Sequence, residues 1–407
     1  MKEELLEKIE KLHDLEKYQE IIDLIEALPA EQLNTDLIGQ LARAYNNVEN
    51  YAKGLELLKS IEFEEGHSLI WNWRAGYSYF FLDDFVNAEK CFLKAYELDP
   101  DDNDTSDFLI TIYRNLAKLE NKNGNSEKAI EYALESKKYV YDEEGTVETD
   151  SFLAWLYDRY EEYTKAEEIL RNQLAKNKDD EWTLAELGYC LSEQEKYEEA
   201  LEYFFAVEKI NKEDVWTYRK IGICYKNLDK REDALKYYLK AVELDQKDTY
   251  SLSDIAWLYD SFGKYEEALK YLERLEELGQ DDSWTNTEFG FCLSRLGRYE
   301  EAIERINRAL EVEDEEKDIA YIYSQLGFCK RKLGEYDEAI EAFKQAKKWG
   351  RNDAWINVEM GYCHKGKNET KEALECYLQA EKFDKKDPYI VSDIAWFYDS
   401  LGQYDEG

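Results

Sequence analysis

Residues that interrupt helices are scarce in this chain: 3 of its 407 residues are proline, and no stretch is rich in serine, glycine and proline together. Proline removes a backbone donor and ends or kinks a helix, so its scarcity favours long helices joined by short turns. Long apolar runs are missing too. The densest run, residues 77–82, is far shorter than the roughly 20 residues that a membrane span needs. The N-terminus also lacks the features of a signal peptide, so we expect a cytoplasmic protein with no membrane partner.

Positive charge is in short supply. The chain has 53 Lys and Arg residues against 92 Asp and Glu residues, which gives a net charge of −39. A field of this sign repels phosphate backbones and acidic lipid surfaces but attracts basic groups, which argues against nucleic acid as a partner. Acidic chains are often disordered. Here, however, 44% of the residues are hydrophobic and 14% are aromatic, which is enough apolar surface for a folded core.

Groups that carry catalysis or bind metals are few. The 3 histidines are far apart in the sequence and the 7 cysteines include no CxxC pair, so we expect no metal site. Residues 361–368 match a Walker A loop in spacing, but Asn368 stands where Ser or Thr would hold Mg²⁺, and no strand precedes them. No nucleophile and base form a catalytic arrangement. We therefore expect no catalytic residue, no cofactor and no enzymatic activity.

One small residue recurs along the chain. The segment 196–201 is matched by 264–269, 298–303 and 335–340, each with an alanine at the same place. That alanine returns most often every 34 residues, at Ala88, Ala129, Ala166, Ala200, Ala234, Ala268, Ala302, Ala339 and Ala373, after weaker copies at Ile21 and Gly54. Self-similarity at this period is typical of helical-repeat arrays.

A second small residue precedes each alanine by twelve positions, and a large apolar residue follows it by four. The small residues are Gly76, Ala154, Gly188, Gly222, Ala256, Gly290, Gly327, Gly361 and Ala395. Small residues on facing helices let the helix axes approach closely, while the large ones fill the space beside them. Each period is thus predicted to be an antiparallel helix pair, with its turn near residues 296–298 or 333–335.

The repeating G…Y…A…[FY]…A pattern resembles the tetratricopeptide repeat family over essentially the whole chain. The resemblance implies an all-α, right-handed superhelical solenoid of antiparallel helix pairs whose first helices line a concave groove. We expect about eleven pairs and then an opening helix, within a single solenoid over 1–407. Its parts would be divergent repeats at 1–68, clear repeats at 69–387 and an incomplete repeat at 388–407. The chain departs from the family in keeping the closing proline of a unit only at Pro100.

Aromatic residues occupy two positions of the first helix that lie opposite the core. Counted from the second small residue at 100° per residue, these are the positions six before it and one after it. They hold Trp155, Trp182, Tyr189, Trp216, Tyr250, Trp257, Trp284, Phe291, Tyr321, Phe328, Trp355, Tyr362 and Trp396. We call this set the aromatic ladder. Polar residues are expected on a solvent-facing stripe, so the ladder predicts a partner-binding surface.

Acidic residues stand two positions before the small residue in many repeats. These are Glu186, Asp254, Glu288, Glu359 and Asp393. An aromatic groove with an acidic edge suits a protein or peptide segment that offers apolar, Lys and Arg side chains, through hydrophobic and cation–π contacts. The sequence thus predicts a protein–protein interaction scaffold, and it leaves the oligomeric state open.

Two other interpretations of the ladder stay open, and so does a different class of function. Thr285 with Glu288, like Thr183 with Glu186, fits a capping box, which would make the tryptophan before each threonine a hydrophobic staple. The ladder could also stack upon itself as filling of the solenoid. A different class of function is a sensory or substrate-docking module of a longer enzyme or regulator that continues beyond residue 407.

Overall fold

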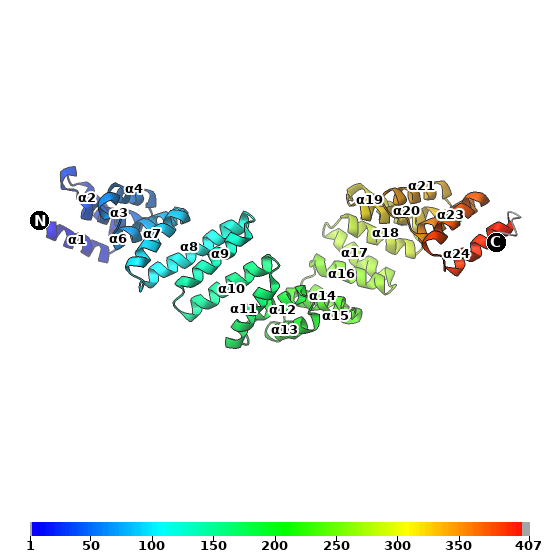
Figure 1. The fold of residues 1–407 in the computed structure, drawn as a ribbon, viewed down its shortest axis with the longest axis horizontal. Coiled ribbons are helices and arrows are strands. Elements are labelled where there is room, and N and C mark those ends of the chain that lie inside the picture. The colour runs from blue at the N-terminus through cyan, green and yellow to red at the C-terminus, as the bar shows by residue number, and fades with distance from the viewer. Residues whose placement is uncertain (1, 401–407) are drawn as a thin grey trace. The chain divides into compact units, whose positions relative to one another are not determined.

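A computed structural model describes residues 2–400, which contain 24 α-helices, two short 3₁₀-helices and no strand. The chain divides into two compact units between Ala206 and Val207. Helices follow one another along each unit in sequence order (Figure 1). Apart from the short α5, the helices form eleven sequential pairs followed by α24, as predicted, and the all-α repeat architecture is confirmed.

The first unit holds five of these pairs and most of a sixth. Its elements are α1 (Lys2–Asp14), α2 (Tyr18–Glu26), η1 (Ala30–Gln32), α3 (Thr35–Asn47), α4 (Tyr51–Ser60), α5 (Glu62–Glu65), α6 (Leu69–Phe81), α7 (Phe85–Leu98), α8 (Asn103–Lys122), α9 (Ser126–Ser136), η2 (Lys137–Tyr139), α10 (Glu143–Arg159), α11 (Tyr163–Lys176), α12 (Glu181–Glu193) and α13 (Tyr197–Ile210), the last of which crosses the boundary.

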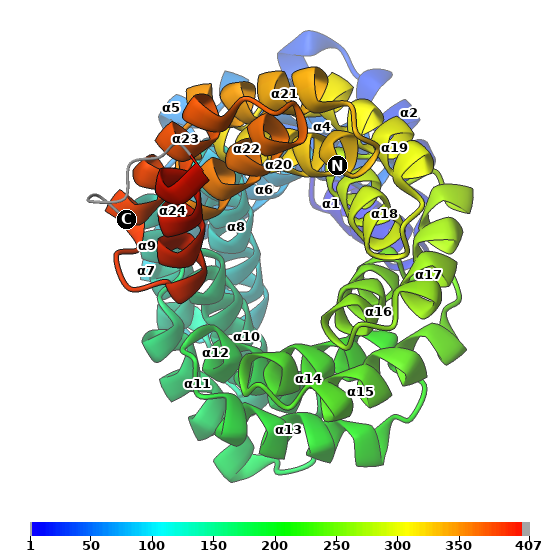
Figure 2. The same ribbon diagram turned by 90° about the vertical axis from the view of Figure 1, so that its right-hand side faces the viewer.

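The second unit repeats the same alternation. Its helices are α14 (Val215–Asn227), α15 (Arg231–Leu244), α16 (Thr249–Ser261), α17 (Tyr265–Glu277), α18 (Ser283–Arg295), α19 (Tyr299–Val312), α20 (Glu316–Lys332), α21 (Tyr336–Lys348), α22 (Ala354–Gly366), α23 (Thr370–Phe383) and α24 (Pro388–Ser400). Within this unit α14, α16, α18 and α20 lie on the inner side of the curve, and α15, α17, α19 and α21 lie on the outer side (Figure 2).

In each helix pair, the turn between the two helices contains one residue with a positive φ. Between α18 and α19 this residue is Gly297, with φ 77°, and the turn predicted at residues 296–298 is therefore confirmed. The same repeat position holds Glu195, with φ 61°, between α12 and α13. Glycine adopts this conformation without the steric cost that a Cβ brings. The other pairs use Glu16, Glu49, Asp83, Gly124, Glu161, Asp229, Gly263, Gly334 and Asn368.

The small residue of each first helix receives a large side chain from the second helix. At Gly327 an added Cβ would lie 2.7 Å from Cε1 of Phe343, and at Gly188 it would lie 2.8 Å from Cε1 of Phe204. Both phenylalanines are fully buried. Close packing at these points thus requires glycine, because no room remains for a methyl group.

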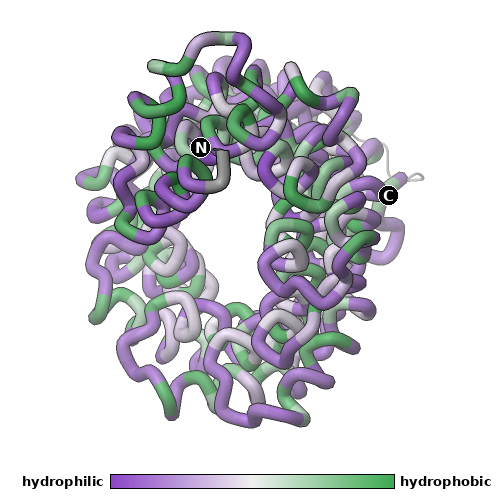
Figure 3. Tube along the Cα trace, turned by 90° about the vertical axis from the view of Figure 1, so that its left-hand side faces the viewer, coloured by the Kyte–Doolittle hydropathy of each residue, from purple (hydrophilic) through white to green (hydrophobic). Residues whose placement is uncertain are grey.

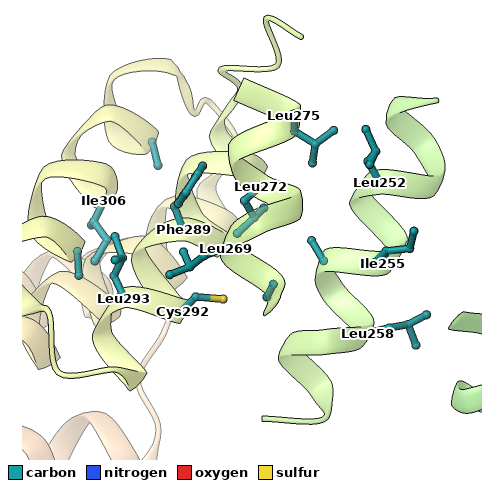
Figure 4. Close-up of a cluster of buried hydrophobic side chains, with 14 of the residues drawn as sticks. Leu252, Ile255, Leu258, Leu269, Leu272, Leu275, Phe289, Cys292, Leu293 and Ile306 are labelled. Carbon is teal, nitrogen blue, oxygen red and sulfur yellow. The ribbon is translucent and has the colours of Figure 1, made fainter. Parts of the chain in front are cut away.

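Buried aliphatic residues complete the core between helices. In the second unit Leu252 and Ile255 of α16 pack with Leu269 and Leu272 of α17, and Phe289 of α18 continues the same cluster (Figure 4). Hydrophobic and hydrophilic stretches alternate along the helices (Figure 3). Residues outside this core, the aromatic ladder among them, keep part of their surface exposed.

Candidate partner-binding groove

The aromatic ladder lies on the first helices, and none of its members is fully buried. Trp284 of α18 is 39% exposed and Tyr250 of α16 is 71% exposed. The exposed members are Trp155, Trp182, Tyr250, Trp284, Tyr321, Trp355, Tyr362 and Trp396. Half-buried are Tyr189, Trp216, Trp257, Phe291 and Phe328. Trp155, Trp182 and Tyr189 belong to the first unit and the rest to the second.

The capping-box interpretation is wrong. The N-cap of α18 is Asp282, whose carboxylate accepts a hydrogen bond from the backbone N–H of Thr285 at 2.7 Å. Asp180 caps α12 in the same way. Each tryptophan is therefore the second residue of its helix and does not precede the N-cap, as a staple residue must. Aspartate, and not threonine, is the N-cap of both helices because its carboxylate accepts a hydrogen bond from a free backbone N–H group at the helix terminus.

Four of the predicted residues meet around one hollow of the second unit. The hollow has a volume of about 600 Å³. Its walls come from α14, α16 and α18 and from the segment before α18: Lys226, Thr249, Tyr250, Ser253, Asp254, Trp257, Gln280 and Trp284. It thus combines three aromatic faces with one carboxylate and one ammonium group.

Within the walls of this hollow, a cation of the chain itself contacts an acidic and an aromatic side chain. Lys226 Nζ lies 2.6 Å from Oδ1 of Asp254 and 5.7 Å from the ring centroid of Trp257. Lys226 comes from α14, whereas Asp254 and Trp257 stand one turn apart on α16. We call this arrangement of a cation, an acid and an aromatic ring a cation clip.

The clip recurs twice in the second unit. Arg331 of α20 binds Glu359 of α22, and its guanidinium carbon lies 5.3 Å from the ring centroid of Tyr362. Lys365 of α22 lies 3.8 Å from Asp393 and 4.5 Å from the ring centroid of Trp396, both on α24. Three of the predicted acids are thus already neutralised within the molecule. These cations were not predicted from the sequence, although they share one repeat position, four residues after the small residue.

The junction of α16 and α18 departs from this pattern. Asp260 stands where the clips have their cation, and Glu288 stands at the acid position. Burial and the neighbouring Asp260 carboxylate raise the pKa of Glu288 to about 7. Burial also raises the pKa of Asp260. Two neighbouring carboxylates without an ion-pair partner disfavour the doubly charged state.

The acid predicted in the first unit, Glu186, is half-buried on α12. A second hollow of about 530 Å³ lies at the other end of this unit, across the predicted divergent repeats (1–68) and the first of the clear repeats, and no site was predicted there. It is lined by Tyr18, Arg43, Asn46, Asn47, Leu69, Ile70, Trp73, Arg74, Tyr77 and Asp102. Burial, followed by Arg43 and Arg74, lowers the pKa of the adjacent His13 to about 4.

Among residues 2–400, no group of three or more His, Cys, Asp and Glu side chains could hold a metal ion. Within the same range, no helix has the length and apolar character that crossing a membrane requires. All seven cysteines are free, and six of them are buried. The segment with Walker A spacing begins within α22, and its Gly361 packs against the ring of Tyr377.

Family models of the tetratricopeptide repeat match residues 72–102, 213–281 and 281–348. No curated protein sequence matches the chain. Among solved structures the chain is similar to YrrB, a TPR protein with an unusual peptide-binding site (23% identity, 46% of this chain and 96% of that chain, TM-score 0.41). It is also similar to the APC/C hetero-tetramer Cut9-Hcn1 (15% identity, 96% of this chain and 95% of that chain, TM-score 0.45). A third similar structure is the C-terminal part of a TPR repeat-containing protein from Cytophaga hutchinsonii (15% identity, 59% of this chain and 98% of that chain, TM-score 0.49).

Proposed function

The chain belongs to the tetratricopeptide repeat family, and from this premise we propose that it is a non-enzymatic scaffold that holds a segment of a partner protein along its first helices. Such a segment would offer apolar side chains to the aromatic ladder, and basic ones to its acidic edge. We place this function in the cytoplasm, where free cysteines such as those of this chain stay reduced.

The hollow between α14, α16 and α18 carries this proposal. Tyr250 and Trp284 are large apolar side chains that remain exposed at its edge although the core does not need them. Aromatic residues in a concave surface are the commonest hot spots of protein interfaces, because they bury much area at a low entropic cost. Trp257 extends the same wall toward the core, where it packs on buried residues of α16 and its neighbours.

Peptide display on the purified chain, followed by affinity measurements on the selected peptide, tests this function. Tyr250→Ala and Trp284→Ala should each weaken binding by ~2 kcal/mol or more, as expected of hot-spot residues. The melting temperature should hardly change in either variant, because both side chains are exposed. The exposed Phe63, outside the ladder, is the matched control: Phe63→Ala should leave the affinity unchanged.

A core variant separates binding from stability. Phe343 is fully buried, so Phe343→Ala should cost about 3–5 kcal/mol of unfolding free energy. If Tyr250→Ala and Trp284→Ala are destabilised as strongly as Phe343→Ala while the folded variants keep their affinity, the ladder fills the solenoid and the proposed function is wrong.

A further inference from the structure

The three cation clips share one geometry. In each, the cation is a Lys or Arg four residues after the small residue of one first helix, and it contacts an acid on the next first helix. The same cation also lies near an aromatic ring, which follows that acid by three residues. The clips are Lys226–Asp254–Trp257, Arg331–Glu359–Tyr362 and Lys365–Asp393–Trp396. The groove of the second unit therefore contains three places at which a basic side chain already binds.

At the junction of α16 and α18 the same frame is present without its cation. The acid position holds Glu288 and the aromatic position holds Phe291, but the cation position holds Asp260. Neither carboxylate forms an ion pair with any described residue. The hydrogen-bond partner of Asp260 is the weak donor Cys292 Sγ, at 3.9 Å. Asp260 and Glu288 therefore repel each other at the positions where each of the three clips holds a cation and an acid.

Arg295 does not take the missing place. Its Nε donates to the hydroxyl of Tyr265 at 3.3 Å, and its guanidinium carbon lies 5.6 Å from the ring centroid of Phe291 on its own helix. It lowers the pKa of Asp260 from a distance, yet burial outweighs this effect and the pKa stays raised. On the next first helix, burial and then the charge of Glu288 raise the pKa of Tyr321 to about 12, although Arg351 and Arg295 oppose the shift.

We propose that Asp260 and Glu288 receive one Lys or Arg side chain of the partner, which takes the place that Lys226, Arg331 and Lys365 take in the clips. This inference rests on the proposed function and names the chemistry of its central contact. The hollow beside Tyr250, Trp257 and Trp284 lies one helical turn before the two carboxylates, since Trp284 precedes Glu288 by four residues and Trp257 precedes Asp260 by three. Apolar residues next to the basic one would enter that hollow.

Charge complementarity favours a cation over other occupants. A half-buried pair of carboxylates disfavours an acidic or purely apolar segment, because neither removes the repulsion. A guanidinium or ammonium group removes it and gains a contact with the ring of Phe291, as in the clips. The net charge of −39 would also attract a basic segment during association.

Two short peptides that differ only in charge test the inference. One is acetylated, amidated Gly-Leu-Arg-Leu-Gly, and its twin has citrulline, which is neutral and nearly isosteric, in place of arginine. By titration calorimetry the arginine peptide should bind roughly tenfold more tightly or better, as expected of a desolvated charge pair. Asp260→Lys should remove this preference, because the chain would then supply its own cation, as at Lys226. Glu288→Gln should also remove it.

Glu243→Lys is the matched control for the change in net charge. Glu243 is exposed near the end of α15, so its reversal alters the charge by the same amount as Asp260→Lys without touching the groove. The preference for arginine should survive in this variant. If Glu243→Lys reduces it as much as Asp260→Lys does, or if Asp260→Lys leaves it intact, the site is not at these carboxylates and the inference is wrong.

The remaining outcomes separate the inference from the proposed function. If both peptides bind the unmodified chain equally and Trp284→Ala weakens both, the result supports the proposed groove function and contradicts the cation site. If neither peptide binds at millimolar concentration, the cation site also falls, and the display-selected ligand still decides the groove function. A pH series adds a second readout: the arginine peptide should bind more tightly at pH 8 than at pH 6, because Glu288, beside Asp260 and Tyr321, ionises near pH 7. In Glu288→Gln this difference should shrink.

Discussion

In several pairs the small residue of the first helix matches the size of the side chain that packs on it, although Gly290 faces the aliphatic Ile306. Glycine faces a ring at Gly327 with Phe343. Where the corresponding residue of the second helix is a leucine, the small residue is alanine, as for Ala256 with Leu272; both of these residues are buried in one cluster. A leucine side chain is narrower than a phenyl ring, so a methyl group fits beside it. The summed volume of the two side chains in contact is thus roughly conserved, although both residues differ between repeats.

Gly327→Ala should lower the unfolding free energy by about 1–3 kcal/mol, the usual cost of overpacking a core. The physical reason is the 2.7 Å separation between the new Cβ and Phe343 Cε1. Chemical denaturation would measure it. In the double variant with Phe343→Leu, which copies the Ala256–Leu272 contact, the methyl group should cost less than in the single variant. Simple additivity of the two changes would show that the size match is not real.

Glu195→Gly should stabilise the chain by about 0.5–1 kcal/mol, because a residue with a Cβ is strained at positive φ and glycine is not. Glu195 has φ 61° in the turn before α13. Thermal unfolding would show the gain. The control is Glu193→Gly, at the last residue of α12 with ordinary helical geometry, where glycine should bring no stabilisation.

At the scale of helices, the clips tie consecutive first helices together through charge. Glu359 is buried at 6% exposure and depends on Arg331 of the preceding repeat. Burial raises the pKa of Glu359, and Arg331 opposes that shift. A buried ion pair contributes little net stability when intact, but it is costly to break from one side.

Arg331→Met should therefore destabilise the chain by roughly 3–5 kcal/mol at pH 8, since the buried carboxylate loses its partner. The loss should shrink as the pH falls toward 5. Without arginine the folded pKa of Glu359 rises further above its unfolded value, so protonation relieves the folded state first. Denaturation curves at several pH values measure this. A pH-independent loss would indicate that Arg331 acts by packing alone.

Periodicity alone predicted the helices, because each pair buries its own repeated face against the next. The eleven pairs and the turn at Gly297 followed from the spacing of small residues. The N-caps were missed, since aspartate and threonine both suit a helix start and only the backbone geometry decides between them. The clips were missed because each joins residues of two repeats, such as Lys226 and Asp254, and a comparison within one repeat does not reveal a contact between neighbours. The ladder as a binding site stays a prediction.

At the scale of the whole molecule, charge is the dominant imbalance. Acidic residues outnumber basic ones by 92 to 53, so the clips and other ion pairs leave many carboxylates without a partner of opposite charge. In a repeat array each unit packs mainly on its neighbours, and like charges recur at the same positions of successive repeats. Self-repulsion of this kind destabilises the folded chain.

Added NaCl should therefore raise the melting temperature between 10 and 150 mM, where the Debye length falls from roughly 30 to 8 Å. Salt also weakens the surface ion pairs, but an exposed pair contributes only about 0–1 kcal/mol, and the excess of acids makes repulsion the larger effect. Charge reversal of an exposed acid should act in the same direction: Glu243→Lys should raise the melting temperature at 10 mM and much less at 150 mM. Differential scanning calorimetry measures both. A melting temperature that falls with salt would mean that the ion pairs, the clips among them, outweigh the repulsion of the remaining carboxylates.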